Sequence, residues 1–128
     1  MTITAMNHFT VLTDDVPRTL AFYCDVLGLR QGARPDLGFP GAWLYAGEVP
    51  VLHVIGGRPR EALKAGVIDH MAFSASDLAA TLARLERAGI TPSSCRRQIG
   101  TGMWQVFVLD PNGAKVELDF DAAEPAPT

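Results

Sequence analysis

Hydrophobic and polar positions along the chain form two similar series, each made of one strand, one helix and three further strands. Each series opens on a short apolar and β-branched run, residues 6–12 and residues 67–75, which is typical of a strand. Apolar residues then recur at helical spacing, at Val16, Leu20, Tyr23 and Leu27 in the first series and at Leu78, Leu82 and Leu85 in the second. Three extended runs follow each helix, separated by Gly, Pro and Asn residues: 29–33, 42–45 and 50–55, then 93–99, 103–109 and 114–120. Both halves are therefore predicted to fold as β-α-β-β-β.

The two halves also match residue by residue, as expected for a duplicated unit. A shift of 62 positions aligns His8 with His70, and aligns the triplet "TLA" at 19–21 with the same triplet at 81–83. We therefore predict an α+β fold with one domain over residues 1–128. It would contain module one at 5–57, module two at 66–120 and a polar, Pro-rich, flexible tail at 121–128.

Short polar signals mark the ends of the predicted elements. Asp14 or Asp15 can cap the first helix, Ser76 can cap the second, and Gly89 ends it. The sequence "DPNG" at 110–113 predicts a tight turn between the last two strands.

Composition and charge exclude several classes of protein. A chain of 128 residues with 48% hydrophobic residues is long enough for one compact domain. Its net charge of −3 gives no basic stripe for nucleic acid, and no apolar run is long enough to span a membrane. Without a recognisable leader segment, the protein is predicted to be cytoplasmic. Cys24 and Cys95 show no metal-binding spacing and are predicted to be free, structural thiols.

The three histidines of the chain all fall on predicted first or last strands of a module. His8 and His70 lie on the first strands, and His53 lies on the last strand of module one. Glu117 takes the place of His53 in module two, 64 residues later. Because side chains alternate across a strand, these four point away from the apolar face that should pack the helices. Three imidazoles and a carboxylate that converge on one cavity would suit one divalent metal ion, such as Zn, Ni, Fe, Mn or Co.

The chain resembles the vicinal oxygen chelate superfamily, which includes glyoxalase I, fosfomycin resistance proteins, extradiol dioxygenases and bleomycin resistance proteins. The segments that carry the resemblance are "NHFTVLTDDV", "FYCDVLGL", "GVIDHMAFSASDL" and "DPNGAKVELDF", within residues 7–120. The resemblance implies two βαβββ modules that form a cupped mixed β-sheet around a metal, with the helices on the outer face. It implies metal ligands at His8, His70 and Glu117, and His53 occupies the place of a fourth ligand. It also implies a small-molecule substrate and a homodimer.

Several reactions are open to such a site, and a glyoxalase-like lyase or isomerase is the first expectation. Glu117 would then be the catalytic base that removes a proton next to a metal-bound carbonyl. An extradiol dioxygenase is the alternative, with His8, His70 and Glu117 on Fe(II) and His53 as a catalytic acid or base. Phe107 argues against it, because it stands where those enzymes place a tyrosine. A fosfomycin-type transferase ranks third, and a drug- or metabolite-binding protein without catalysis is the alternative from another class.

Residues that could contact a substrate come from two Gly-containing segments, "RPDLGFPGAWLY" and "GTGMWQ", and from the strand after the second. The candidates are Arg34, Phe39, Trp43, Tyr45, Met103, Trp104 and Phe107. Trp43 and Tyr45 could equally fill the core or a dimer interface.

Overall fold

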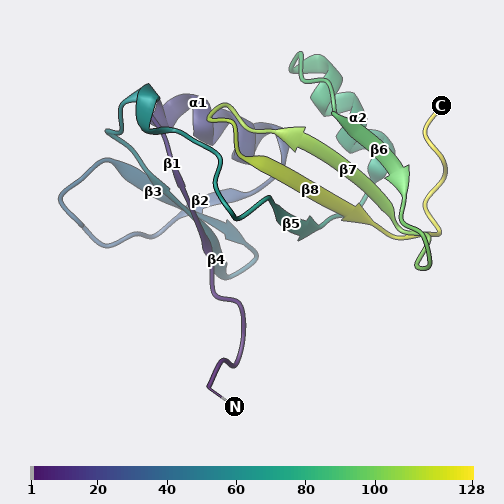
Figure 1. Ribbon diagram of the computed structural model, residues 1–128, viewed down its shortest axis with the longest axis horizontal. Helices are drawn as coiled ribbons and strands as arrows, with labels where there is room; N and C mark the ends of the chain where they lie inside the picture. Colours follow the sequence, from purple (N-terminus) through teal and green to yellow (C-terminus); the bar gives the residue numbers. More distant parts are fainter. Residues whose placement is uncertain (1) are drawn as a thin grey trace. The chain divides into compact units, whose positions relative to one another are not determined.

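A computed structural model describes residues 2–128 and divides the chain into two compact units, Met1–Leu63 and Lys64–Thr128. The elements of the first unit are β1 (Phe9–Leu12), α1 (Val16–Leu20), β2 (Arg30–Gly32), β3 (Gly41–Ala46) and β4 (Val49–Ile55), followed by a short 3-10 turn at Arg60–Ala62. Those of the second unit are β5 (Met71–Ser74), α2 (Leu78–Arg87), β6 (Ser94–Arg97), β7 (Trp104–Leu109) and β8 (Lys115–Phe120). The predicted α+β fold with two βαβββ modules is confirmed (Figure 1).

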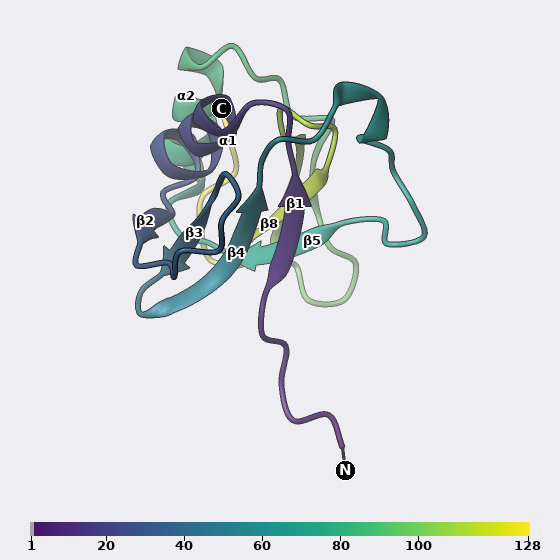
Figure 2. The same ribbon diagram turned by 90° about the vertical axis from the view of Figure 1, so that its left-hand side faces the viewer.

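Each unit builds its own four-stranded mixed sheet with the same strand order. The first sheet has the order β1-β4-β3-β2 and the second the order β5-β8-β7-β6. In both units the first strand pairs in parallel with the last one, and the remaining pairs are antiparallel. Figure 2 shows β1 and β4 running side by side in the first unit. Two strands that pair in parallel need a long crossover connection, and in each unit this connection contains the helix and the two middle strands.

One face of each sheet is apolar and forms the core of its unit, as the alternation of side chains predicts. In the first unit the buried strand residues are Val11, Ala42, Leu44, Leu52 and Val54, and the helical segment adds Phe22 and Tyr23. In the second unit they are Met71, Val106, Val108, Val116, Leu118 and Phe120, with Leu78 and Leu85 from α2. The opposite face of each sheet is therefore left for polar chemistry.

The helix of the first unit changes its winding halfway along. The sequence predicts one regular helix through Leu27, but α1 ends at Leu20 and continues as a π-helical stretch, Ala21–Val26. The amide of Leu27 donates to the carbonyl of Phe22, five residues earlier, at 3.1 Å. In this wider turn two consecutive aromatic side chains, Phe22 and Tyr23, are both buried.

The N-terminus of α2 is capped by two residues. Asp77 is the N-cap residue and adopts a left-handed conformation with φ 66°, so the prediction of Ser76 is wrong. The C-terminal segment provides the second cap, which the sequence analysis does not foresee. The carboxylate of Glu124 accepts hydrogen bonds from the amides of Leu78 at 2.6 Å and Asp77 at 3.2 Å. The backbone carbonyl of Glu124 accepts a further bond from the indole of Trp104 at 3.1 Å.

The turn predicted between the last two strands is present. Asp110 Oδ1 accepts hydrogen bonds from the amides of Asn112 and Ala114, each at 2.8 Å. Gly113 follows with φ 90°, a conformation that glycine adopts without steric cost. Among residues 2–128, no helix has the length and apolar character needed to cross a membrane.

Candidate metal-binding residues in each unit

The two repeat-equivalent pairs seen in the sequence lie at the same place in both sheets. His8 and His70 directly precede β1 and β5, which are shorter than the predicted strands. In the first unit Thr10, two residues after His8, pairs with His53 on β4. In the second unit Ala72, two residues after His70, pairs with Glu117 on β8. Each unit therefore brings one histidine and one residue of its last strand to the polar face of its sheet.

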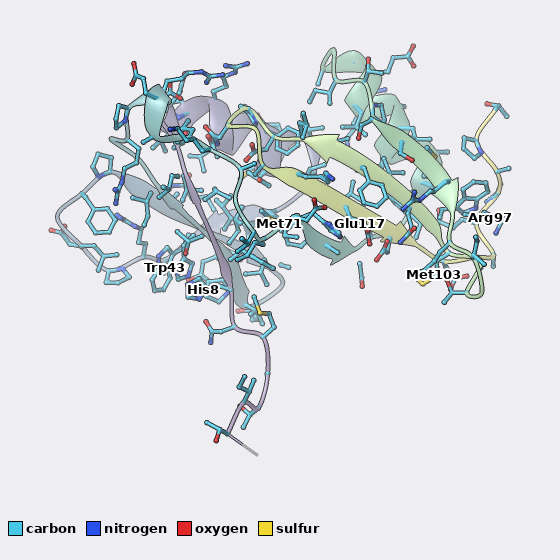
Figure 3. The ribbon with its side chains drawn as sticks, viewed as in Figure 1. His8, Trp43, Met71, Arg97, Met103 and Glu117 are labelled. Carbon is cyan, nitrogen blue, oxygen red and sulfur yellow. The ribbon has the colours of Figure 1, made fainter. Side chains whose placement is uncertain are left out.

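In the first unit three aromatic rings form a stack. The ring of His53 lies between the ring of His8, at a centroid distance of 3.7 Å, and the indole of Trp43, at 4.2 Å. The interplanar angles are 16° and 8°, so that all three rings are nearly parallel. Trp43 and His53 are direct partners across β3 and β4, and Figure 3 shows Trp43 close to His8. Sheet register thus builds two layers of the stack, and the segment before β1 adds the third.

The surroundings of His53 favour its neutral form. Burial lowers the pKa of His53, and the nearby His8 and Arg34 lower it further because a second positive charge would be repelled. The guanidinium of Arg34 packs over the ring of Phe39 and donates to its carbonyl at 3.0 Å. Its Nε atom is buried without a hydrogen-bond partner. A fixed positive charge therefore lies near the stack.

In the second unit His70 and Glu117 face each other. His70 Nε2 lies 3.4 Å from Glu117 Oε1, and the other carboxylate oxygen accepts a hydrogen bond from Gln105 at 3.4 Å. Glu117, which is labelled in Figure 3, lies on β8 and is only 8% exposed. Burial raises the pKa of Glu117, and the neighbouring carboxylate of Asp119, two residues along the same strand face, raises it further. A buried carboxylate of this kind needs a cation or a proton.

Both histidines are oriented by the residue before them. The Nδ1 atom of His8 lies 2.7 Å from Asn7 Oδ1, and that of His70 lies 2.8 Å from Asp69 Oδ2. If Nδ1 carries the proton in each ring, Nε2 keeps its lone pair for a metal. The ammonium of Lys115 lies 3.0 Å from the same Asp69 oxygen, and the bonds from His70 and Lys115 hold the pKa of Asp69 below its usual range. The sequence analysis missed Asn7 and Asp69, although a side-chain oxygen before each repeated histidine is visible in the sequence.

The predicted substrate contacts divide between the faces of the sheets. Phe107 pairs with Glu117 and lies edge-on to His70, with ring centroids 5.7 Å apart, so it lines that site. Trp104 lies on the opposite face of the second sheet, where Arg97 packs over its ring at 4.2 Å. Met103 immediately precedes β7 and is only partly exposed.

In the first unit, the remaining candidate contacts Phe39 and Tyr45 pack against two different arginines, Arg34 and Arg30. Phe39 is exposed under the Arg34 guanidinium. The hydroxyl of Tyr45 donates to the carbonyl of Ala33 and is thereby engaged within the unit.

The donor set suits a divalent transition metal. Two ligand atoms about 2.1 Å from one ion are separated by roughly 3 to 3.5 Å, depending on the coordination angle. The 3.4 Å between His70 Nε2 and Glu117 Oε1 falls in that range. Within neither unit, as far as the described residues extend, do three or more His, Cys, Asp or Glu side chains form a group able to hold a metal ion.

Comparison with known proteins connects this arrangement to one family. Residues 5–118 match the family model described as the Glyoxalase/Bleomycin resistance protein/Dioxygenase superfamily. Glyoxylase I 4 of Arabidopsis thaliana is 29% identical over 122 residues, which cover 91% of this chain and 70% of that protein. The glutathione transferase FosA of Serratia marcescens is 30% identical over 117 residues, covering 89% of this chain and 79% of that protein.

Solved structures show the same fold. The fosfomycin resistance protein FosX from Listeria monocytogenes superposes with a TM-score of 0.74 at 15% identity, covering 94% of this chain and 96% of that one. Lactoylglutathione lyase from Agrobacterium tumefaciens superposes with a TM-score of 0.67 at 24% identity, covering 94% and 96%. One FosX structure, that of a point mutant, holds Mn(II) and 1S,2S-dihydroxypropylphosphonic acid.

Proposed function

Because the chain belongs to the Glyoxalase/Bleomycin resistance protein/Dioxygenase superfamily, we propose that it is a divalent-metal-dependent enzyme with glyoxalase-like lyase or isomerase chemistry. The proteins similar to it include a glyoxylase I and a glutathione transferase, and one FosX structure holds Mn(II). The proposed substrate is a small molecule with two adjacent oxygens. The observation that carries the proposal is the buried Glu117, which faces His70 Nε2 at the spacing of two ligands on one ion.

The proposed ligands are His8, His70 and Glu117. Because Asn7 and Asp69 engage Nδ1 of the two histidines, Nε2 is the proposed donor atom in both rings. The protein is further proposed to be a homodimer. Zn, Ni, Fe, Mn and Co all remain candidates, because imidazole and carboxylate donors accept each of them.

The proposed catalytic base is Glu117. A bound divalent cation would supply Lewis-acid polarisation of a substrate oxygen. Glu117 would remove a proton from the adjacent carbon. Gln105 donates to one oxygen of Glu117 and so fixes the orientation of the carboxylate. Phe107 packs edge-on against the ring of His70.

Ring cleavage by an extradiol dioxygenase is the second candidate. Two histidines and one carboxylate are the ligand set that non-haem Fe(II) oxygenases use, and His8, His70 and Glu117 provide it. Phe107 next to His70 offers no hydroxyl to position a catechol, which favours the isomerase or lyase. Arg34, Trp43 and Phe39 are proposed to line the substrate site beside the first unit's ring stack.

The test is elemental analysis of protein purified without a His tag, followed by reconstitution with each of the five metals. Activity is then assayed on a 2-oxoaldehyde–thiol adduct, on a catechol, and on fosfomycin with glutathione. We expect turnover of the adduct with Ni, Zn, Mn or Co, and loss of both metal and turnover in His70→Ala and Glu117→Gln.

Glu86→Gln, an exposed change on α2, is the matched control and should keep both metal and turnover. Stoichiometric Fe with catechol cleavage would put the dioxygenase first. Turnover of fosfomycin alone would favour the transferase. If the wild-type protein bound no metal after reconstitution, the proposal of a metal-dependent enzyme would fall, and a metal-free binding protein would take its place.

A further inference from the structure

We infer that His53 is a positioning residue, which holds the imidazole of His8 by stacking and does not itself bind the metal. The inference rests on the proposed metal-dependent function. It assigns different roles to two histidines that the sequence analysis groups together as metal ligands.

The relative orientation of the two rings is the first argument. A metal bound to an imidazole lies in the plane of that ring, about 2.0 to 2.1 Å from the nitrogen. The rings of His8 and His53 lie face to face, with centroids 3.7 Å apart and planes inclined by 16°. An ion in the plane of the His8 ring therefore lies about one ring spacing away from the plane of the His53 ring. In this arrangement the two histidines cannot both direct a lone pair at the same ion.

The surroundings of the His53 nitrogen give the second argument. Its Nε2 atom has less than 1 Å² of accessible surface and no hydrogen-bond partner. An ion could reach that atom only by displacing the atoms packed against it. The two flat faces of the ring, by contrast, are both in contact, one with His8 and the other with Trp43.

The layers of the stack show what the contact achieves. Trp43 and His53 are fixed by direct pairing of β3 with β4, whereas His8 lies before the first residue of β1 and outside the sheet pairing. The His8 side chain is thus held by two contacts, the hydrogen bond of Nδ1 to Asn7 and the face of His53. Together they fix both the rotation of the ring and the direction of Nε2. A ligand fixed in advance loses less conformational entropy when it binds the ion.

The experiment measures metal affinity in variants that separate a flat ring from a nitrogen donor. Calorimetric titration of the metal-free full chain with Mn²⁺ and Zn²⁺ compares wild type with His53→Phe, His53→Leu and His8→Gln. His53→Phe keeps a ring that can stack and removes both nitrogens, so its affinity should stay within about threefold of wild type. His53→Leu should lose about tenfold, the usual range for a residue that orients a ligand. His8→Gln, which removes a ligand, should lose more than about a hundredfold.

Nitrogen chemical shifts of ¹⁵N-histidine-labelled wild type provide a readout that does not depend on the folding of any variant. On addition of Zn²⁺, Nε2 of His8 and Nε2 of His70 should shift, and both nitrogens of His53 should keep the values of a neutral, unbound ring. A coordination shift at His53 would overturn the inference. So would a loss in His53→Phe as large as that in His8→Gln, or full affinity in His53→Leu.

These outcomes are distinguishable from failure of the proposed function. If the wild-type chain bound neither ion, the metal-dependent function and the role of His53 would fall together. If the wild type bound the ion and His53→Phe lost it, only the role of His53 would fall.

Discussion

Removal of the Asp69 carboxylate should weaken metal binding without removing any proposed ligand. Asp69 Oδ2 lies 2.8 Å from His70 Nδ1, and this contact keeps the ring with Nε2 directed at Glu117 Oε1, 3.4 Å away. A carboxylate on the far nitrogen of a ligating histidine also increases the basicity of the ring. In Asp69→Ala the ring loses the hydrogen bond that orients it, and either nitrogen can carry the proton.

The size of the effect follows from the exposure of the pair. Loss of such an orienting group typically costs 10-fold to 100-fold in metal affinity. The side chain of Asp69 is 70% exposed and that of His70 is 35% exposed, so solvent screens the interaction. We therefore expect a loss of about tenfold, at the lower end of that range. Asp69→Asn should lose less, because Asn7 already provides an amide oxygen to His8 in the equivalent place.

Calorimetric titration with Zn²⁺ and Mn²⁺ measures the dissociation constants, and Lys115→Met is the matched control. That variant removes the ammonium from Asp69 and leaves the contact between Asp69 and His70 in place. It should bind metal within about twofold of wild type, as exposed ion pairs contribute little. An unchanged affinity in Asp69→Ala would refute the reasoning. Equal losses in Asp69→Ala and Lys115→Met would also refute it, because the ion pair would then be responsible.

Three further changes test stability and pH dependence by thermal and chemical denaturation of the metal-free chain. Glu124→Ala should remove the carboxylate cap of α2 at a cost of about 1 kcal/mol, which lowers the Tm by roughly 3 to 5 °C in a chain of this size. Glu124→Gln should lower the Tm by less. An unchanged Tm in Glu124→Ala would contradict the role of Glu124 as a cap. Glu117→Gln should stabilise the metal-free chain near neutral pH. The raised pKa of Glu117 means that the wild type loses stability as pH rises above the ordinary range of a glutamate. A Tm of Glu117→Gln below that of wild type at pH 7 would contradict this prediction. The lowered pKa of His53 has the opposite effect on the pH dependence of stability. Its contribution to stability is complete above about pH 6.5 and is lost as pH falls toward the lowered pKa. His53→Phe should flatten this part of the curve of stability against pH, and an unchanged curve would contradict the contribution of His53.

The architecture was largely predictable because it is repeated and periodic. Alternation along the strands, helical spacing and the "DPNG" turn are local properties of the sequence. Because the chain is duplicated, the same order of elements could be predicted independently in each half. The same alternation predicted that His8 and His53 lie on one side of the first sheet, and their rings are stacked against each other. The resemblance of the chain to a known superfamily was likewise visible in its motifs and is confirmed by the family match.

Local end effects were less predictable, since they depend on contacts that are distant in sequence. Ser76 and Asp77 are both good caps, and the choice of Asp77 coincides with a backbone conformation that also offers its amide to Glu124. That bond joins residues 47 positions apart. The tail that composition suggested to be flexible thus contains a specific capping residue. A polar composition indicates that a segment can be solvated, but it does not indicate that one side chain, here Glu124, binds a distant helix end.

The chemical roles of the site residues divide along the same line. The sequence alone determined which potential metal ligands the chain contains, namely three imidazoles and a carboxylate at repeat-equivalent positions. Only the tertiary structure decided that the rings of His8 and His53 lie face to face, while His70 Nε2 and Glu117 Oε1 face each other at 3.4 Å. Strand periodicity gives the face on which a side chain lies, but the rotation of its ring is set by the atoms packed around it. That rotation determines which lone pairs can reach an ion.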